Sequence, residues 1–149
     1  MSAPIVNSKA DWRTIGEQTK YFRSAWEANY ARWLQYQLEH KMIASWQHEP
    51  ETFWFPEIKR GVRSYLPDFR IVRADGSIFF AEVKGFMDSK SLTKLKRFKR
   101  FYPSNEIVVA DSNWFRLNSP KLKLLIPEWE VCESCIPKKK IMAKKKVYI

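Results

Sequence analysis

The stretch SYLPDFRIVRADGSIFFAEVKGF, residues 64–86, decides the fold that we expect for this chain. Two runs of apolar and aromatic residues, 65–73 and 77–84, are typical of β-strands, and an Asp-Gly turn joins them. Each run carries an acid, Asp68 in the first and Glu82 in the second. A buried carboxylate without a partner is costly, and two neighbouring carboxylates repel each other. The pair therefore needs an explanation other than packing.

The length of the turn decides whether the two acids face each other. A two-residue loop would place Asp68 opposite Val83, on the wrong face of the hairpin. A three-residue loop over residues 74–76 would place Asp68 opposite Glu82. It would also put Gly76 where the backbone needs a positive φ. We therefore expect the three-residue loop.

Lys84 follows Glu82 by two residues, so both side chains lie on one face of the second strand. A divalent cation between converging carboxylates replaces their repulsion with attraction, and oxygen ligands suit Mg²⁺ or Mn²⁺. Lys84 beside such a cation could stabilise charge on a phosphate or hold an attacking water. This set of groups predicts phosphodiester hydrolysis. The alternative is a cross-strand salt bridge between Lys84 and either acid on an exposed face.

The segment SAWEANYARWLQYQLEHKM, residues 24–42, predicts an amphipathic helix with Ser24 as its N-cap. Glu27 falls within the apolar sector of this helix, in line with Ala31 and Leu34. An acid in that position indicates a functional role. The alternative is a capping box, in which Glu27 only returns a hydrogen bond to the Ser24 amide.

The rest of the chain supplies the other elements of a mixed α/β fold. Residues 44–56 are interrupted by prolines and favour one or two short strands. A basic helix is expected over 89–102 and a short buried strand over 106–110. The pattern of 111–131 fits either strand or loop. The predicted order is therefore α-β-β-β-α-β.

Three sequence blocks resemble the PD-(D/E)XK nuclease superfamily: PDF at 67–69, EVKG at 82–85 and FRSAWE at 22–27. The last of them is similar to the F-R-S-x-x-E stretch of phage endonuclease I, the branch that resolves Holliday junctions. Related blocks occur in small phage-encoded nucleases. The resemblance covers residues 21–110. It implies a restriction-endonuclease-like α-β-β-β-α-β core, with a mixed central sheet flanked by helices.

The resemblance also implies roles for individual residues. Asp68 and Glu82 would be metal ligands, with the Val83 carbonyl beside them. Lys84 would be the catalytic lysine. Glu27 would complete the catalytic site or bind a second metal. The expected cofactor is Mg²⁺ or Mn²⁺.

These roles predict a Mg²⁺-dependent DNA endonuclease that is specific for branched DNA and similar to a Holliday junction resolvase. A less selective DNA nuclease, or an exonuclease that trims ends, is one alternative. A nucleic-acid-binding protein that keeps this fold without catalysis is the other. Because a four-way junction offers two symmetry-related strands, we also expect a homodimer.

The distribution of charge predicts DNA as a partner. The formal net charge is +11, and 12 of the 27 Lys and Arg residues lie in residues 89–105 and 134–149, which contain no acid. The remaining 15 nearly balance the 16 Asp and Glu residues. Such segregated positive charge favours a polyanion. The candidate DNA-binding residues are Arg23, Lys90, Lys94, Arg97, Arg100, Lys138, Lys139 and Lys140.

The chain divides into an N-terminal arm over 1–20, a nuclease domain over 21–131 and a Cys/Lys-rich basic tail over 132–149. We expect an intracellular protein of a phage or bacterial host cytoplasm, without a membrane partner, because no apolar run spans a bilayer and no secretory signal is recognisable. Two cysteines cannot make a disulfide framework, which agrees with a reducing compartment.

The two cysteines, Cys132 and Cys135, form half of a zinc site. His40 and His48 could complete the site within one chain, or a dimer could supply a second pair of cysteines. Two free thiols are the alternative that we favour.

Overall fold

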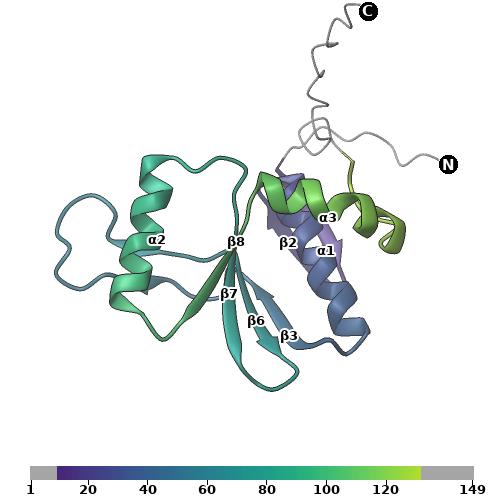
Figure 1. Ribbon diagram of the computed structural model, residues 1–149, viewed down its shortest axis with the longest axis horizontal. Helices are drawn as coiled ribbons and strands as arrows, with labels where there is room; N and C mark the ends of the chain where they lie inside the picture. Colours follow the sequence, from purple (N-terminus) through teal and green to yellow (C-terminus); the bar gives the residue numbers. More distant parts are fainter. Residues whose placement is uncertain (1–9, 132–149) are drawn as a thin grey trace, which may run out of the picture.

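A computed structural model of the chain describes residues 10–131 (Figure 1). The segments 1–9 and 132–149 lie outside this range. The predictions made for Cys132, Cys135, Lys138, Lys139 and Lys140 therefore fall outside the described residues. Among the described residues, no helix combines the length and the apolar character that crossing a bilayer requires.

A mixed four-stranded sheet forms the centre of the fold, with the strand order β3-β6-β7-β8. Its strands are β3 (Ile43–His48), β6 (Phe69–Arg73), β7 (Ile78–Val83) and β8 (Glu106–Ala110). Strand β6 pairs antiparallel with both β3 and β7, and β8 pairs parallel with β7. A parallel pair needs a crossover connection, and helix α2 (Ser89–Phe101) provides it.

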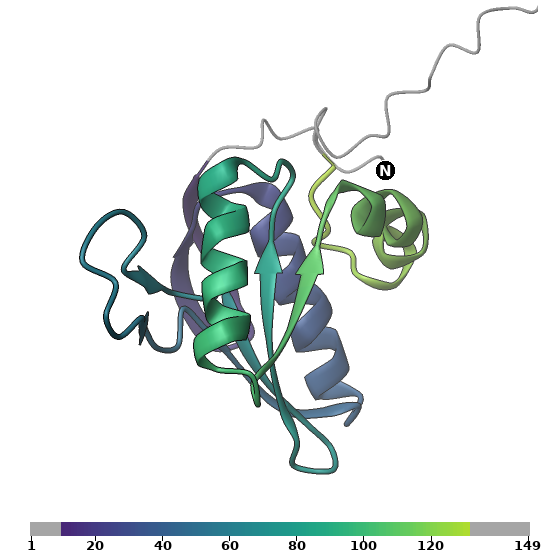
Figure 2. The ribbon, with the colours of Figure 1, turned by 60° about the vertical axis from the view of Figure 1, so that its left-hand side comes forward.

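Helices cover both faces of this sheet (Figures 1 and 2). Helix α2 lies on one face, where Phe98 packs against Phe80. Helices α1 (Ala25–Glu39) and α3 (Ser112–Leu125) share the other side, in a core that includes Phe69. The predicted α/β class with a mixed sheet is confirmed. The elements α1, β3, β6, β7, α2 and β8 follow one another in the expected order, but β1, β2, β4, β5 and α3 are additional to it.

The hairpin between β6 and β7 has the predicted three-residue loop. The ladder pairs Val72 with Ile78, and the Arg73 amide donates to the Ser77 carbonyl at 2.8 Å. Gly76 adopts a φ of 87°, which favours glycine. Extending the register from the Phe69 and Ala81 pair by one residue puts Asp68 opposite Glu82.

Both predicted helices are present. The Ser24 hydroxyl caps α1 by accepting a hydrogen bond from the Glu27 amide at 3.1 Å. Helix α1 ends at Glu39, three residues before the predicted end. Asp88 caps α2 in the same way. Leu92 on α2 is 47% exposed, whereas Phe98 is fully buried.

The interpretation of residues 111–131 as strand or loop is wrong, because α3 occupies most of this segment. Its N-cap Asp111 accepts a hydrogen bond from the Trp114 amide at 2.9 Å. Phe115 and Leu122, seven residues apart, are both buried on one side of the helix. Pro120 lies inside the helix and hides this pattern, since proline usually marks a helix end.

The strand expected over 65–73 is interrupted. Its first part, β5 (Ser64–Tyr65), pairs with β4 (Phe53–Trp54) in a separate two-stranded sheet. Pro67 follows, and its missing amide hydrogen cannot extend a ladder. The central strand β6 begins only at Phe69. Strands β3 and β4 agree with the one or two short strands predicted over 44–56.

The predicted N-terminal arm contains a β-hairpin of β1 (Asp11–Ile15) and β2 (Gln18–Phe22). The boundary at residue 21 therefore falls within β2. Ile15 and Phe22 are buried in the core beside α1. The Arg13 guanidinium binds the Glu130 carboxylate, with Nε 2.7 Å from Oε2, so the hairpin is also fixed to the chain after α3.

Candidate active site

Asp68 and Glu82 each use one carboxylate oxygen within the fold. Asp68 Oδ2 accepts a hydrogen bond from the Val83 amide at 2.8 Å. Glu82 Oε2 accepts one from the Tyr65 hydroxyl at 2.6 Å. Within residues 10–131, the other oxygens, Asp68 Oδ1 and Glu82 Oε1, have no hydrogen-bond partner. Both carboxylates are thus fixed in direction and retain one oxygen for a ligand.

The surroundings of the two acids raise the cost of ionising them. Burial, followed by the charges of Glu82 and Glu27, raises the pKa of Asp68 to about 8, although the Val83 amide and Arg23 act in the opposite direction. Burial also raises the pKa of Glu82, despite the Tyr65 hydrogen bond. A fold that places acids together at this cost is typical of a functional site.

Two lysines lie close enough to the acids to affect their ionisation. The positive charges of Lys84 and Lys94 both act to lower the pKa of Glu82, against the larger effect of burial. The Lys84 amide donates to the Ala110 carbonyl at 3.0 Å, which fixes the end of β7 to β8. Among the described residues, no ion pair joins Lys84 to Asp68 or Glu82. The cross-strand salt bridge considered as an alternative is therefore not formed.

Glu27 is buried, and two groups hold its carboxylate. Glu27 Oε1 lies 2.6 Å from His48 Nε2. Glu27 Oε2 accepts a hydrogen bond from the Arg23 amide at 3.1 Å. Only one half of the predicted capping box exists, because the carboxylate bonds the amide of Arg23 instead of that of Ser24. The charge of Glu27 raises the pKa of Asp68, which places it near the acidic pair.

Among residues 10–131, one group of three side chains, Glu27, His48 and Glu49, is spaced closely enough that it could hold a metal ion. Their possible ligand atoms lie within 4.8 Å of one another. Asp68 and Glu82 do not belong to this group. The structure therefore brings Asp68 and Glu82 together as a pair and holds Glu27 beside them through a different set of contacts.

The predicted DNA-binding residues of the described chain differ in their surroundings. The Arg23 guanidinium is exposed and lies 3.0 Å from Glu49. Lys90 and Arg100 are exposed on α2, and Lys94 is half-buried. Arg97 instead donates to the Val62 carbonyl and so ties α2 to the segment before β5. Arg97 is therefore less available to a phosphate than its neighbours.

Sequence reasoning missed two residues of this site. Tyr65 holds Glu82, and His48 holds Glu27. The Tyr65 contact depends on the separate β4-β5 sheet, which no local pattern indicated. His48 was considered only for zinc, and its Nε2 is occupied by Glu27. The other histidine of that prediction, His40, has Nδ1 2.8 Å from the Tyr36 carbonyl oxygen.

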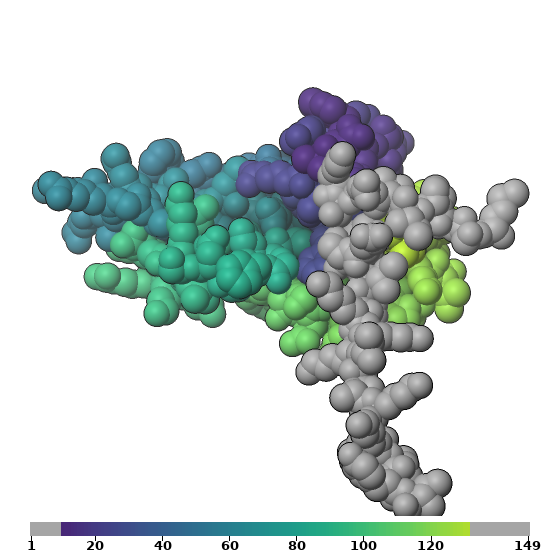
Figure 3. Space-filling model, turned by 90° about the horizontal axis from the view of Figure 1, so that it is seen from above, coloured from purple at the N-terminus to yellow at the C-terminus, as the bar shows by residue number. Residues whose placement is uncertain are grey.

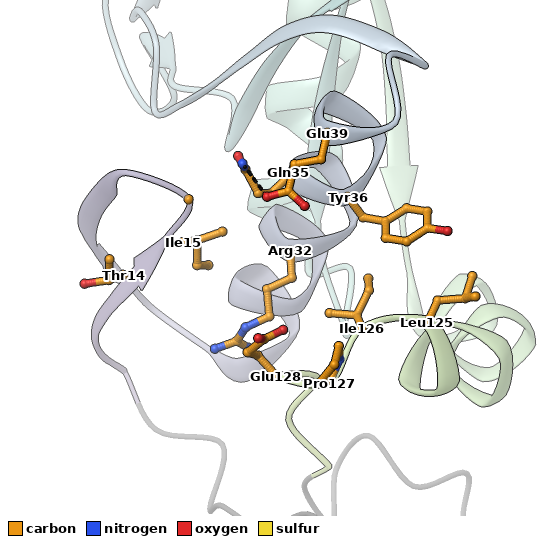
Figure 4. Close-up of a pocket in the computed structure, with 11 residues that line it drawn as sticks. Thr14, Ile15, Arg32, Gln35, Tyr36, Glu39, Leu125, Ile126, Pro127 and Glu128 are labelled. Atoms are coloured by element: carbon orange, nitrogen blue, oxygen red, sulfur yellow. Dashed lines mark hydrogen bonds between the residues drawn. The ribbon is translucent and has the colours of Figure 1, made fainter.

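A separate hollow of about 470 Å³ lies between the β1-β2 turn, α1 and the chain after α3 (Figure 4). It contains none of the predicted site residues. Arg32 in its wall is bound to Glu130 at 2.7 Å, and Gln35 donates to Glu39 at 3.1 Å. The polar groups of this hollow therefore serve mainly to join the C-terminal segment to α1 and to bridge neighbouring turns of that helix.

The chain matches no protein-family model, and no curated protein or solved structure is significantly similar to it. The functional interpretation therefore depends on the geometry and the chemistry of the site.

Proposed function

We propose that this chain is a divalent-metal-dependent DNA endonuclease of the PD-(D/E)XK type. One observation carries the proposal: Asp68 and Glu82 lie opposite each other on adjoining strands and share a raised cost of ionisation. Lys84 lies beyond Glu82 on the same strand face. A purely binding protein gains nothing from buried acids near a phosphate backbone, because they repel it.

The residues present fit a hard divalent cation. Asp68 Oδ1 and Glu82 Oε1 have no hydrogen-bond partner among residues 10–131, and carboxylate oxygens suit Mg²⁺ or Mn²⁺. Asp68, Glu82 and the Val83 carbonyl would hold the ion, with Glu27 close by. When bound, the metal supplies Lewis-acid polarisation of the phosphate and activation of water.

The lysines would act on the charge of the substrate. The Lys84 ammonium stabilises the negative charge that grows on the phosphate in the transition state. Lys94 lies near Glu82 and would contact a neighbouring phosphate of the DNA strand that is cut. The hydrogen bond from the Lys84 amide to the Ala110 carbonyl keeps the Lys84 backbone fixed, so the base of this side chain is held in place before the reaction starts.

Branched DNA is the substrate that we propose, cut by a homodimer with one site in each chain. The support for this choice is the FRSAWE block, which contributes Glu27 and its cap. Both the homodimer and the branched substrate go beyond the chemistry of the acidic pair.

The test is an incubation with Mg²⁺ and end-labelled four-way junction, flap, duplex and single-stranded DNA in parallel. We expect internal cleavage of the junction, with no cleavage in EDTA. Equal cutting of all four substrates would favour the less selective nuclease, and shortening from the ends would favour an exonuclease. Binding without cleavage of any substrate would contradict the proposal.

A further inference from the structure

The outer face of the β1-β2 hairpin presents two aromatic rings to solvent. Trp12 is 65% exposed and Tyr21 is 47% exposed. They occupy opposite positions of the ladder, and their ring centroids are 5.8 Å apart at an angle of 66°. Figure 3 shows the hairpin, in purple, projecting at one edge of the molecule. An aromatic pair exposed to this extent is typical of a recognition surface.

A hollow of about 520 Å³ leads from this aromatic pair to the edge of the proposed active site. It is lined by Trp12, Thr19, Lys20, Tyr21, Arg23, His48 and Glu49. Two of these residues connect the hollow to the site directly. The Arg23 amide and the His48 imidazole both hydrogen-bond the Glu27 carboxylate.

The charges in the hollow suit phosphate groups. Lys20 is exposed and forms no ion pair within residues 10–131. Arg23 is paired with Glu49, but its side chain is 66% exposed. An exposed pair of this kind contributes little free energy, so a phosphate can compete for the guanidinium. Aromatic rings between cationic side chains are the combination that binds single-stranded nucleic acid.

We propose that this hollow binds an unpaired DNA strand next to the active site. Its bases stack on Trp12 and Tyr21, and its phosphates contact Lys20 and Arg23. The inference deepens the proposed nuclease function, on which it rests, by naming an unpaired segment as part of the substrate. Stacking accepts every base, so the hollow selects for single-stranded structure and not for sequence. This property suits an enzyme that recognises branch points.

The test is the affinity of the full chain for a labelled ten-nucleotide oligothymidylate, measured by fluorescence anisotropy in EDTA, so that no metal-dependent cleavage takes place. Trp12→Ala and Tyr21→Ala should each weaken binding by roughly 5- to 150-fold, the range for losing one stacked base. Trp12→Phe should retain most of the affinity. The matched control is Trp54→Ala, because Trp54 is 62% exposed but lies on β4, outside the hollow, and its loss should leave binding unchanged. Thermal unfolding of each variant verifies that it is folded.

Several outcomes would overturn the inference. These are undetectable binding of oligothymidylate by the unmodified chain, and equal affinities for the Trp12→Ala, Tyr21→Ala and Trp54→Ala variants. A change from dimer to monomer in Trp12→Ala with unchanged oligothymidylate affinity would assign this face to a second copy of the chain. Aromatic-dependent binding in a chain that cleaves no DNA would support the hollow and contradict the nuclease proposal, so the two failures are distinguishable.

Discussion

The Tyr65 hydroxyl donates a hydrogen bond to Glu82 Oε2 across 2.6 Å, from a strand pair outside the central sheet. This contact favours the ionised form of Glu82 and opposes the effect of burial on its pKa. It also directs one oxygen of Glu82 toward Tyr65 and leaves Oε1 for another ligand. Tyr65 is thus a positioning residue for the proposed metal ligand.

Tyr65→Phe should weaken Mn²⁺ binding at pH 7 by roughly tenfold, because a hydrogen bond to a charged group contributes about 1.5 kcal/mol or more. Without this bond, the pKa of Glu82 rises and the carboxylate loses its orientation. Calorimetry measures the affinity. Tyr102→Phe is the matched control, since it removes a hydroxyl that donates to the Trp54 carbonyl. Equal affinities for the two variants would remove Tyr65 from the site.

Lys84→Ala should lower kcat by roughly 100-fold or more with little change in substrate affinity, because its charge acts mainly in the transition state. Single-turnover cleavage and DNA binding, measured in parallel, separate the two effects. Lys99→Ala removes an exposed lysine from α2 and should leave kcat unchanged. A Lys84→Ala variant that lost only affinity would make Lys84 a phosphate-binding residue.

Lys94→Gln should reduce the slope of log affinity against log salt by about one unit, because one phosphate contact is lost. DNA binding is measured at several salt concentrations in EDTA. Lys121→Gln is the control, since Lys121 is exposed on α3, a helix on the opposite side of the sheet from α2. An unchanged slope for Lys94→Gln would show that Lys94 does not contact a DNA phosphate.

Asp68 should make stability depend on pH when no metal is present. Its pKa in the folded chain is about 8, above the unfolded value, so folding favours the protonated carboxyl. The stability that this preference provides is complete below about pH 4 and is lost as the pH rises through 8. Asp68→Asn, which can still accept the Val83 hydrogen bond, should therefore be more stable than the unmodified chain at pH 9 in EDTA.

Urea unfolding of both proteins between pH 4 and pH 9 measures this difference in the free energy of unfolding. The advantage of Asp68→Asn should shrink as the pH falls toward 4. Saturating Mg²⁺ should stabilise only the unmodified chain strongly, since the amide introduced by Asp68→Asn lacks the charge that binds the ion. A difference that stays constant with pH would contradict the raised pKa.

The sequence predicted the parts of the site that depend on local chemistry. The position of Gly76 fixed the loop length, and the loop length fixed the register that places Asp68 opposite Glu82. Glu27 was predicted from its position on the apolar sector of α1, and it is buried there. These are consequences of backbone geometry over a few residues.

The parts that depend on distant segments were not predictable in this way. His48 meets Glu27 because β3 lies beside β6 and against α1, and Tyr65 meets Glu82 because Pro67 separates β5 from the central sheet. The helix α3 was missed because Pro120 interrupts its pattern. The β1-β2 hairpin was missed because its outer face carries Trp12 and Tyr21 where a hairpin that only packs would carry polar residues.

The measurement that tests the account most directly compares the unmodified chain with Glu82→Gln on labelled four-way junction DNA in Mg²⁺. This substitution keeps the size of the side chain and an oxygen for the Tyr65 hydrogen bond, but it removes the charge. Glu51→Gln, at an exposed position outside the site, is the control. The account predicts that Glu82→Gln loses cleavage to the level seen in EDTA while DNA binding stays equal or becomes tighter. Undiminished cleavage by Glu82→Gln would contradict it.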